Sequence, residues 1–210
     1  MHADELTAES ACDALTARLA NTLKASIPDV GIDEYRNNSE DLAVISELHS
    51  DSHSYIGGIT TASPLVEYEV EPNLALLPGK QGVCARPSIS VVMGYSAISV
   101  LMNIEIPRNS CLYNSVFAHE MHHVDIYRHY INRNLDTFKS SVDAKFNGKS
   151  YLFNSIFEAK QYTEILGQVF AQHLKEKFMS EVNAEQKALD TQTEYARIQL
   201  ECSSPRAHPF

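Results

Sequence analysis

The residues of this sequence that could do chemistry are concentrated in one short segment, from Val116 to Asp125. The segment contains a His-Glu-x-x-His pattern, with His119 and His123 four positions apart and Glu120 directly after the first histidine. On an α-helix, four positions are one turn plus about 40°, so both imidazoles would project from one face and could share one Zn²⁺. The carboxylate of Glu120 could then reach a metal-bound water and act as a general base. The pattern therefore predicts a zinc site on a helix.

The surrounding residues predict that this helix is buried on the side of the histidines. We expect a helix over residues 112–132, in which Val116, Ile126 and Tyr127 share the face of the histidine pair. Two buried histidines one turn apart are costly unless something satisfies their ring nitrogens. This favours a bound metal over a pair of hydrogen-bonded core histidines.

The segment from His119 to His123 resembles the active-site helix of zincin-type metallopeptidases. A β-hairpin expected over residues 88–106 is similar to the zincin order, in which an edge strand above the metal binds the peptide substrate in extended form. More loosely, residues 66–133 resemble bacterial secreted proteins assigned as zinc-dependent proteases by sequence alone. The resemblance implies a zinc peptidase that acts on polypeptides. The alternatives are a non-catalytic or structural metal-binding interaction protein and a zinc amidase with a non-peptide substrate.

A catalytic zinc needs a third protein ligand, and the resemblance suggests where to look for it. His129 has metzincin-like spacing, but the required turn would fall at Ile126, whose β-branched side chain resists a positive φ. In gluzincins the third ligand is a glutamate on a following helix, which points to Glu158 or Glu194. Glu158 could instead form a capping box with Ser155, and Glu194 could instead support a ligating histidine. We expect Glu158 to be the third ligand, with Glu194 and His129 as alternatives.

Attack on a peptide carbonyl builds negative charge on its oxygen, so the site would also need an oxyanion stabiliser. The candidates are Tyr162 and Tyr195, with Tyr127 and Tyr130 as further possibilities. The sequence does not choose among its ten tyrosines.

The rest of the chain must position this helix. Leucines at helical spacing predict a helix over residues 3–26, and alternation predicts a strand over residues 65–70. Runs rich in Val and Ile on either side of Gly94-Tyr95-Ser96 predict the hairpin. Residues 133–150 are mixed and end in Asn147-Gly148, and two helices are expected over residues 150–179 and 181–201.

We therefore predict one α+β domain, which the resemblance places in the zincin-like class, with a small antiparallel or mixed sheet. It comprises an N-terminal helix and polar loop (1–64), the sheet and the His-Glu-x-x-His helix (65–149), and long C-terminal helices (150–210).

Charge and hydropathy narrow the range of partners that the protein could bind. Lys and Arg number 17 against 27 Asp and Glu, a net charge of −10 that disfavours nucleic acids and anionic membranes. The sequence contains no apolar run of about 18 residues, so no membrane span is expected. The oligomeric state stays open.

Four cysteines form an even set: Cys12, Cys84, Cys111 and Cys202. Their spacings fit no zinc pattern, which leaves two disulfides or four buried thiols. A bridge between Cys84 and Cys111 would pin the expected hairpin beside the metal helix. Disulfides would favour a periplasmic or secreted location, although the chain opens without a visible signal peptide.

Overall fold

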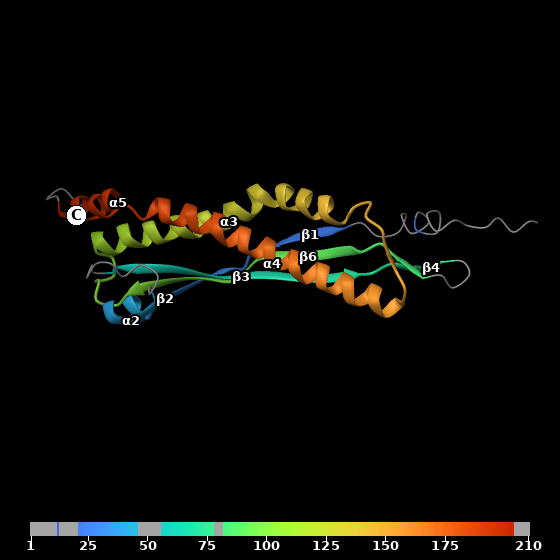
Figure 1. Cartoon of the computed structure of the whole chain (residues 1–210). Coiled ribbons are helices and arrows are strands. Elements are labelled where there is room, and N and C mark those ends of the chain that lie inside the picture. The colour runs from blue at the N-terminus through green and yellow to red at the C-terminus, as the bar shows by residue number, and fades with distance from the viewer. Residues whose placement is uncertain (1–11, 13–20, 46–55, 78–81, 204–210) are drawn as a thin grey trace, which may run out of the picture. The chain divides into compact units, whose positions relative to one another are not determined.

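The computed structural model describes residues 12, 21–45, 56–77 and 82–203. Helices and strands both contribute, so the fold is α+β, as predicted (Figure 1). In chain order the elements are β1 (Thr22–Ser26), β2 (Val30–Asn37), α2 (Ser39–Ile45), β3 (Gly58–Glu71), β4 (Leu74–Leu76), β5 (Val83–Ala85), β6 (Ser88–Asn103), α3 (Cys111–Phe146), β7 (Tyr151–Phe153), α4 (Ile156–Leu189) and α5 (Gln192–Ser203).

Contacts divide the chain into two compact units, each assembled from separate segments. The first comprises Met1–Ser26, Leu65–Gly94 and Arg133–Lys177, and the second comprises Ile27–Pro64, Tyr95–Asn132 and Phe178–Phe210. Each unit combines strands and helices from distant parts of the chain.

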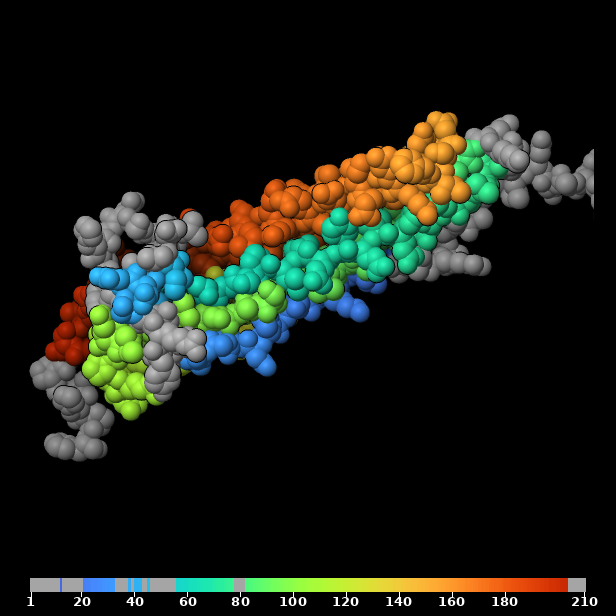
Figure 2. Space-filling view, turned by 90° about the horizontal axis from the view of Figure 1, so that it is seen from below, coloured from blue at the N-terminus to red at the C-terminus, as the bar shows by residue number. Residues whose placement is uncertain are grey.

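The larger sheet is organised around β6, which pairs in parallel with β1 and with β2 and also pairs with β3. In the space-filling view, β3 and β6 run side by side on the face shown (Figure 2). Along the second half of β6, Ile98, Val100 and Met102 are buried at every second position, as expected for a strand with one face on the core.

The predicted hairpin over residues 88–106 is wrong, because β6 runs without a turn from Ser88 to Asn103. Gly94 has a φ of +152°, and a Cβ there would lie 2.0 Å from the main-chain oxygen of Ser26. The glycine is therefore required by the close approach of β1 rather than by a turn. β1 also corrects the predicted N-terminal helix: residues 22–26 form this strand. The rest of the predicted helix, except Cys12 and Asn21, lies outside the described residues.

The helices are longer than predicted. α3 continues through the segment expected to be mixed and ends at Phe146, so the predicted end at residue 132 is wrong. Gly148, with a φ of +71°, follows this end. α4 runs through the expected break at residue 180 and ends at Leu189. A small antiparallel sheet in the first unit, β4-β5-β7, was missed because each strand has three residues.

The core of the second unit fixes α3 against β6 and the C-terminal part of α4. The buried ring of Tyr95 on β6 lies 5.1 Å from that of Tyr127 on α3 and 5.3 Å from that of Phe178 on α4, measured between centroids. Tyr130, about two helical turns after His123, also packs on Phe178. These aromatic contacts bring the motif and the end of α4 together.

All four cysteines form disulfides, as one of the two sequence interpretations predicted. The proposed Cys84–Cys111 bridge is wrong: Cys12 pairs with Cys84, and Cys111 pairs with Cys202. The second bridge joins the first residue of α3 to the end of α5. Two disulfides fit an oxidising compartment outside the cytoplasm.

Among the described helices, none is long and apolar enough to cross a membrane.

Candidate metal centre

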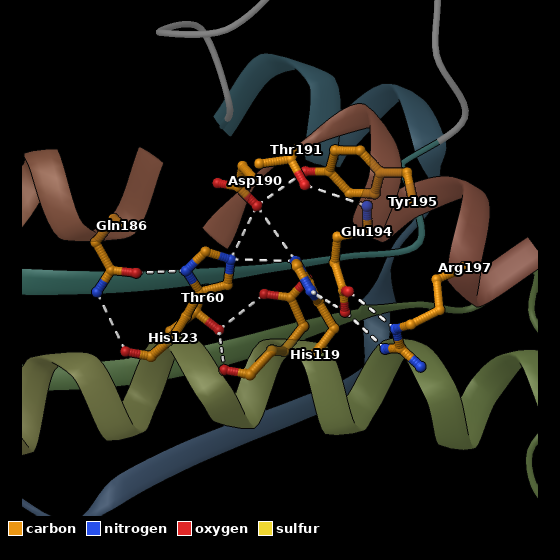
Figure 3. Close-up of polar contacts among 10 residues, drawn as sticks. Thr60, His119, His123, Gln186, Asp190, Thr191, Glu194, Tyr195 and Arg197 are labelled. Atoms are coloured by element: carbon orange, nitrogen blue, oxygen red, sulfur yellow. Dashed lines mark hydrogen bonds and ion pairs between the residues drawn. The ribbon is translucent and has the colours of Figure 1, made fainter. Parts of the chain in front are cut away.

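The two histidines of the motif lie on one buried face of α3, as predicted. The exposed fractions of His119 and His123 are 3% and 7%. Their Nε2 atoms are 3.2 Å apart, and the rings are nearly perpendicular at 86°. Figure 3 shows both imidazoles projecting from α3 toward Asp190. Both Nε2 atoms therefore face the same small volume.

Asp190 supplies the third group. Its Oδ1 lies 3.2 Å from Nε2 of His119 and 3.0 Å from Nε2 of His123. Tetrahedral zinc with ligands at 2.0–2.1 Å separates neighbouring ligand atoms by about 3.3 Å. The three atoms thus have the spacing of three corners of such a tetrahedron. In the described part of the chain they form one group able to hold a metal ion.

The break between α4 and α5 presents Asp190. Leu189 ends α4, and Thr191 caps α5 by accepting a hydrogen bond on Oγ1 from the main-chain N–H of Glu194 at 3.2 Å. The hydroxyl of Tyr195 donates to Oδ1 of Asp190 at 2.9 Å. The helix break and the tyrosine together orient the carboxylate toward the histidines.

Gln186 determines which ring nitrogen of His123 faces the site. Its Nε2 donates to the main-chain oxygen of His123 at 3.1 Å, so its Oε1 is the atom hydrogen-bonded to Nδ1 of the same histidine. Because an amide oxygen only accepts, Nδ1 of the neutral ring must carry the hydrogen. Nε2 then presents a lone pair toward His119 and Asp190, as a metal ligand must.

Nδ1 of His119 faces α5. The closest acid is Glu194, whose Oε1 lies 3.6 Å away, and Arg197 donates to both oxygens of Glu194 at 2.9 and 2.6 Å. The hydrogen bond from Arg197 is the main cause that lowers the pKa of Glu194 to about 2. A carboxylate is therefore held beside the ring atom that points away from Asp190.

Glu120 is buried beside the histidines and is held by β3. The hydroxyl of Thr60 lies 2.8 Å from Oε2 of Glu120 and 3.0 Å from its main-chain oxygen. A Cβ at Gly58 would come within 2.9 Å of Cγ of Glu120, so only glycine leaves room for this side chain. Burial raises the pKa of Glu120, although Thr60 and the two histidines oppose that rise.

The charges of the site are strongly coupled. Burial by itself would raise the pKa of Asp190, but hydrogen bonds with His119 and His123 outweigh it and lower that pKa below its usual range. Burial would lower the pKa of His123, whereas hydrogen bonds with Asp190 and Gln186 raise it overall. Three acceptor atoms this close repel one another unless a proton or a metal ion lies among them.

The other predicted site residues lie elsewhere. Glu158 is exposed and caps α4: its carboxylate accepts from the main-chain N–H of Asn154 at 3.1 Å, and its own N–H donates to Ser155 at 3.2 Å. The capping interpretation of Glu158 is therefore the one realised, and Asp190 stands where Glu158 was expected. His129 is exposed and is not part of the metal-binding group.

Among the tyrosines, Tyr195 lies at the site, whereas Tyr162 packs in the first unit against Tyr151 and Phe153. Sequence reasoning missed Asp190, Gln186 and the role of Thr60. A signal for Asp190 was present: Thr191-x-x-Glu194 is a capping box, which would have located the helix break directly after Asp190.

Comparison of the chain with known protein families, with curated proteins and with solved structures gives no significant match. The chemical interpretation therefore depends on the geometry of the site.

Proposed function

We propose that this protein is a zinc-dependent peptidase whose metal ligands are His119, His123 and Asp190. One observation carries the proposal: three acceptor atoms from two distant segments lie within 3.0–3.2 Å of one another, and Gln186 turns the Nε2 lone pair of His123 toward the other two. Two imidazole nitrogens and one carboxylate oxygen suit zinc, and three protein ligands leave a fourth position open for water.

Bound zinc would lower the pKa of a water molecule and polarise the substrate carbonyl. Glu120, next to the first histidine, would be the group to accept a proton from such a water and to pass it to the leaving amine. Thr60 holds the carboxylate of Glu120 in place through its hydroxyl. Tyr195 keeps its proton, because burial and then the charge of Asp190 raise its pKa. Its one hydroxyl hydrogen is donated to Asp190, so it would have to turn from Asp190 to the substrate to donate to the oxygen that gains charge.

A polypeptide substrate fits the position of β3. β6 pairs with β1 and β2 on one side and with β3 on the other, so neither of its edges is free to pair with a substrate near the site. β3 pairs with β6 alone among the described strands, and it carries Thr60, which contacts Glu120. An extended peptide that pairs with the remaining edge of β3 would pass beside the general base. The zincin-like assignment and a periplasmic or secreted location belong to the same proposal.

The central test compares wild-type protein with Glu120→Gln, and uses Asp125→Asn, an exposed carboxylate on the same helix, as the matched control. We expect Glu120→Gln to bind one zinc ion per chain and to lose cleavage of casein and of a peptide library. Asp125→Asn should bind zinc and cleave like the wild type.

The alternatives give different results. A structural metal site would bind zinc with no turnover in any variant, and a non-peptide amidase would cleave small amides but neither casein nor peptides. A wild-type protein that purifies without metal and takes up none from micromolar zinc would contradict the proposal altogether.

A further inference from the structure

The ring of His119 has one nitrogen in the metal-binding group and one nitrogen directed at α5. The second, Nδ1, is completely buried and has no hydrogen-bond partner within 3.5 Å. Oε1 of Glu194 lies just beyond that distance, at 3.6 Å. The environment of Nδ1 is therefore dominated by one carboxylate.

Arg197 immobilises that carboxylate. Its Nε donates to Oε2 of Glu194 at 2.9 Å and its Nη2 donates to Oε1 at 2.6 Å, so the guanidinium fork engages both oxygens. The remaining Nη1 donates to Glu201 at 2.9 Å. The main chain of Glu194 is fixed as well, because its N–H donates to Oγ1 of Thr191, the N-cap residue of α5. The carboxylate thus has little freedom to turn away from His119 (Figure 3).

A neutral imidazole carries its hydrogen on either Nδ1 or Nε2. A hydrogen on Nε2 of His119 would point into the space shared with His123 and Asp190 and would block a cation there. Two carboxylates compete for this hydrogen. Oδ1 of Asp190 lies 3.2 Å from Nε2, whereas the carboxylate of Glu194, 3.6 Å from Nδ1, favours the other tautomer, with the hydrogen on Nδ1 and the lone pair on Nε2.

We infer that Arg197 is a positioning residue of the site: by clamping Glu194, it favours the hydrogen of His119 on Nδ1 against the competing Asp190, and so makes the lone pair of Nε2 available to a metal. The benefit for metal binding rests on the proposed function, but the effect of Arg197 and Glu194 on the tautomer of His119 can be measured without metal.

The experiment records two-bond ¹H–¹⁵N correlations of the imidazoles in full-length, metal-free protein, because the ¹⁵N shifts report the tautomer. His119 is assigned from its loss in His119→Gln. The variants are Glu194→Ala, Arg197→Ala and the matched control Glu201→Gln, whose carboxylate binds Arg197 but is not in contact with His119. Zinc affinity is measured on the same samples by competition with a chromophoric chelator.

In the wild type and in Glu201→Gln, we expect the same ratio of the two His119 tautomers, with a measurable share of Nδ1–H although Asp190 lies beside Nε2. Glu194→Ala should shift this ratio roughly tenfold toward the hydrogen on Nε2, since the negative charge facing Nδ1 is removed and Asp190 is left unopposed. It should also weaken zinc binding roughly 10- to 100-fold. Arg197→Ala should change both in the same direction by a smaller factor.

An unchanged tautomer in Glu194→Ala would overturn the inference, and an Arg197→Ala variant that behaves like Glu201→Gln would overturn the role of Arg197. If the tautomer changes as expected while even the wild type fails to bind zinc, the positioning role is supported and the proposed metal function is contradicted.

Discussion

Oδ1 of Asp190 lies 3.0 Å from Nε2 of His123, although 67 positions separate the two residues in the chain. The same oxygen lies 3.2 Å from Nε2 of His119 and accepts the hydroxyl of Tyr195. An acid at the end of α4 is therefore joined to a motif within α3. This relationship makes a pair of histidines into a site with three potential ligands.

Replacing Asp190 with alanine should abolish tight zinc binding. Removal of a ligand should weaken affinity by more than the roughly 10- to 100-fold typical of groups behind the ligands. The comparison is Glu158→Ala, the acid that the sequence favoured. It should bind zinc normally and lower the free energy of unfolding by about 1 kcal/mol, because only a helix cap is lost. The measurements are chelator competition and denaturant unfolding. Weaker binding in Glu158→Ala than in Asp190→Ala would restore Glu158 as the ligand.

Thr60→Val should lower kcat roughly tenfold, because it removes a hydrogen bond to the buried general base that is worth about 1.5 kcal/mol. Thr60→Ser keeps the hydroxyl and should retain most of the activity. Neither change should alter zinc affinity, since Thr60 contacts Glu120 and not the proposed ligands. Steady-state kinetics on one peptide substrate would test this. Equal rates for the valine and serine variants would mean that the hydroxyl does not position Glu120.

The two disulfides should differ in their effect on the metal. Each closes a long loop, with sequence separations of 91 for Cys111–Cys202 and 72 for Cys12–Cys84, so replacing either pair by serine should cost about 2–5 kcal/mol of stability. Only the first bridge ties α5, which carries Glu194 and Tyr195, to the start of α3. We therefore expect weaker zinc binding in Cys111→Ser/Cys202→Ser than in Cys12→Ser/Cys84→Ser. Equal zinc affinities in the two double variants would contradict this expectation.

Zinc should stabilise the protein more strongly as the pH rises from about 5.5 to about 8. The folded-state pKa of His123 is raised, so its ion pair with Asp190 stabilises the metal-free protein at low pH and is lost as the pH rises through that pKa. The pKa of Asp190 is lowered, so this residue stays ionised throughout that range. Zinc binds the neutral imidazole of His123, so its affinity for the folded protein should rise as His123 loses its proton. The difference in Tm with and without zinc should grow with pH. A difference that is constant or larger in acid would show that no proton competes with the metal.

Much of the site was predictable because it is local. The 3.6-residue repeat of the α-helix decides that His119 and His123 share a face, and the chemistry of imidazole makes that face a candidate metal site. The end of the helix was less predictable: α3 continues to Phe146, just before Asn147-Gly148, and not to the expected residue 132. The segment around Gly94 was wrongly predicted to be a turn, because glycine occurs both in turns and where two strands approach closely. The local sequence does not distinguish the two cases.

The sequence by itself thus determined the pair of histidines, the adjacent Glu120, the even set of cysteines and the mixture of helices and strands. Only the tertiary structure decided that Asp190 joins the pair, that Gln186 and Glu194 lie behind the rings, and that Cys111 bonds Cys202. The physical reason is the sequence separation of the residues that make each contact. Spacing along one helix places atoms within a turn of each other, whereas a third ligand or a disulfide partner depends on which distant segments pack together. Here that packing is set by aromatic contacts of β6, α3 and α4, whose partners no local pattern identifies.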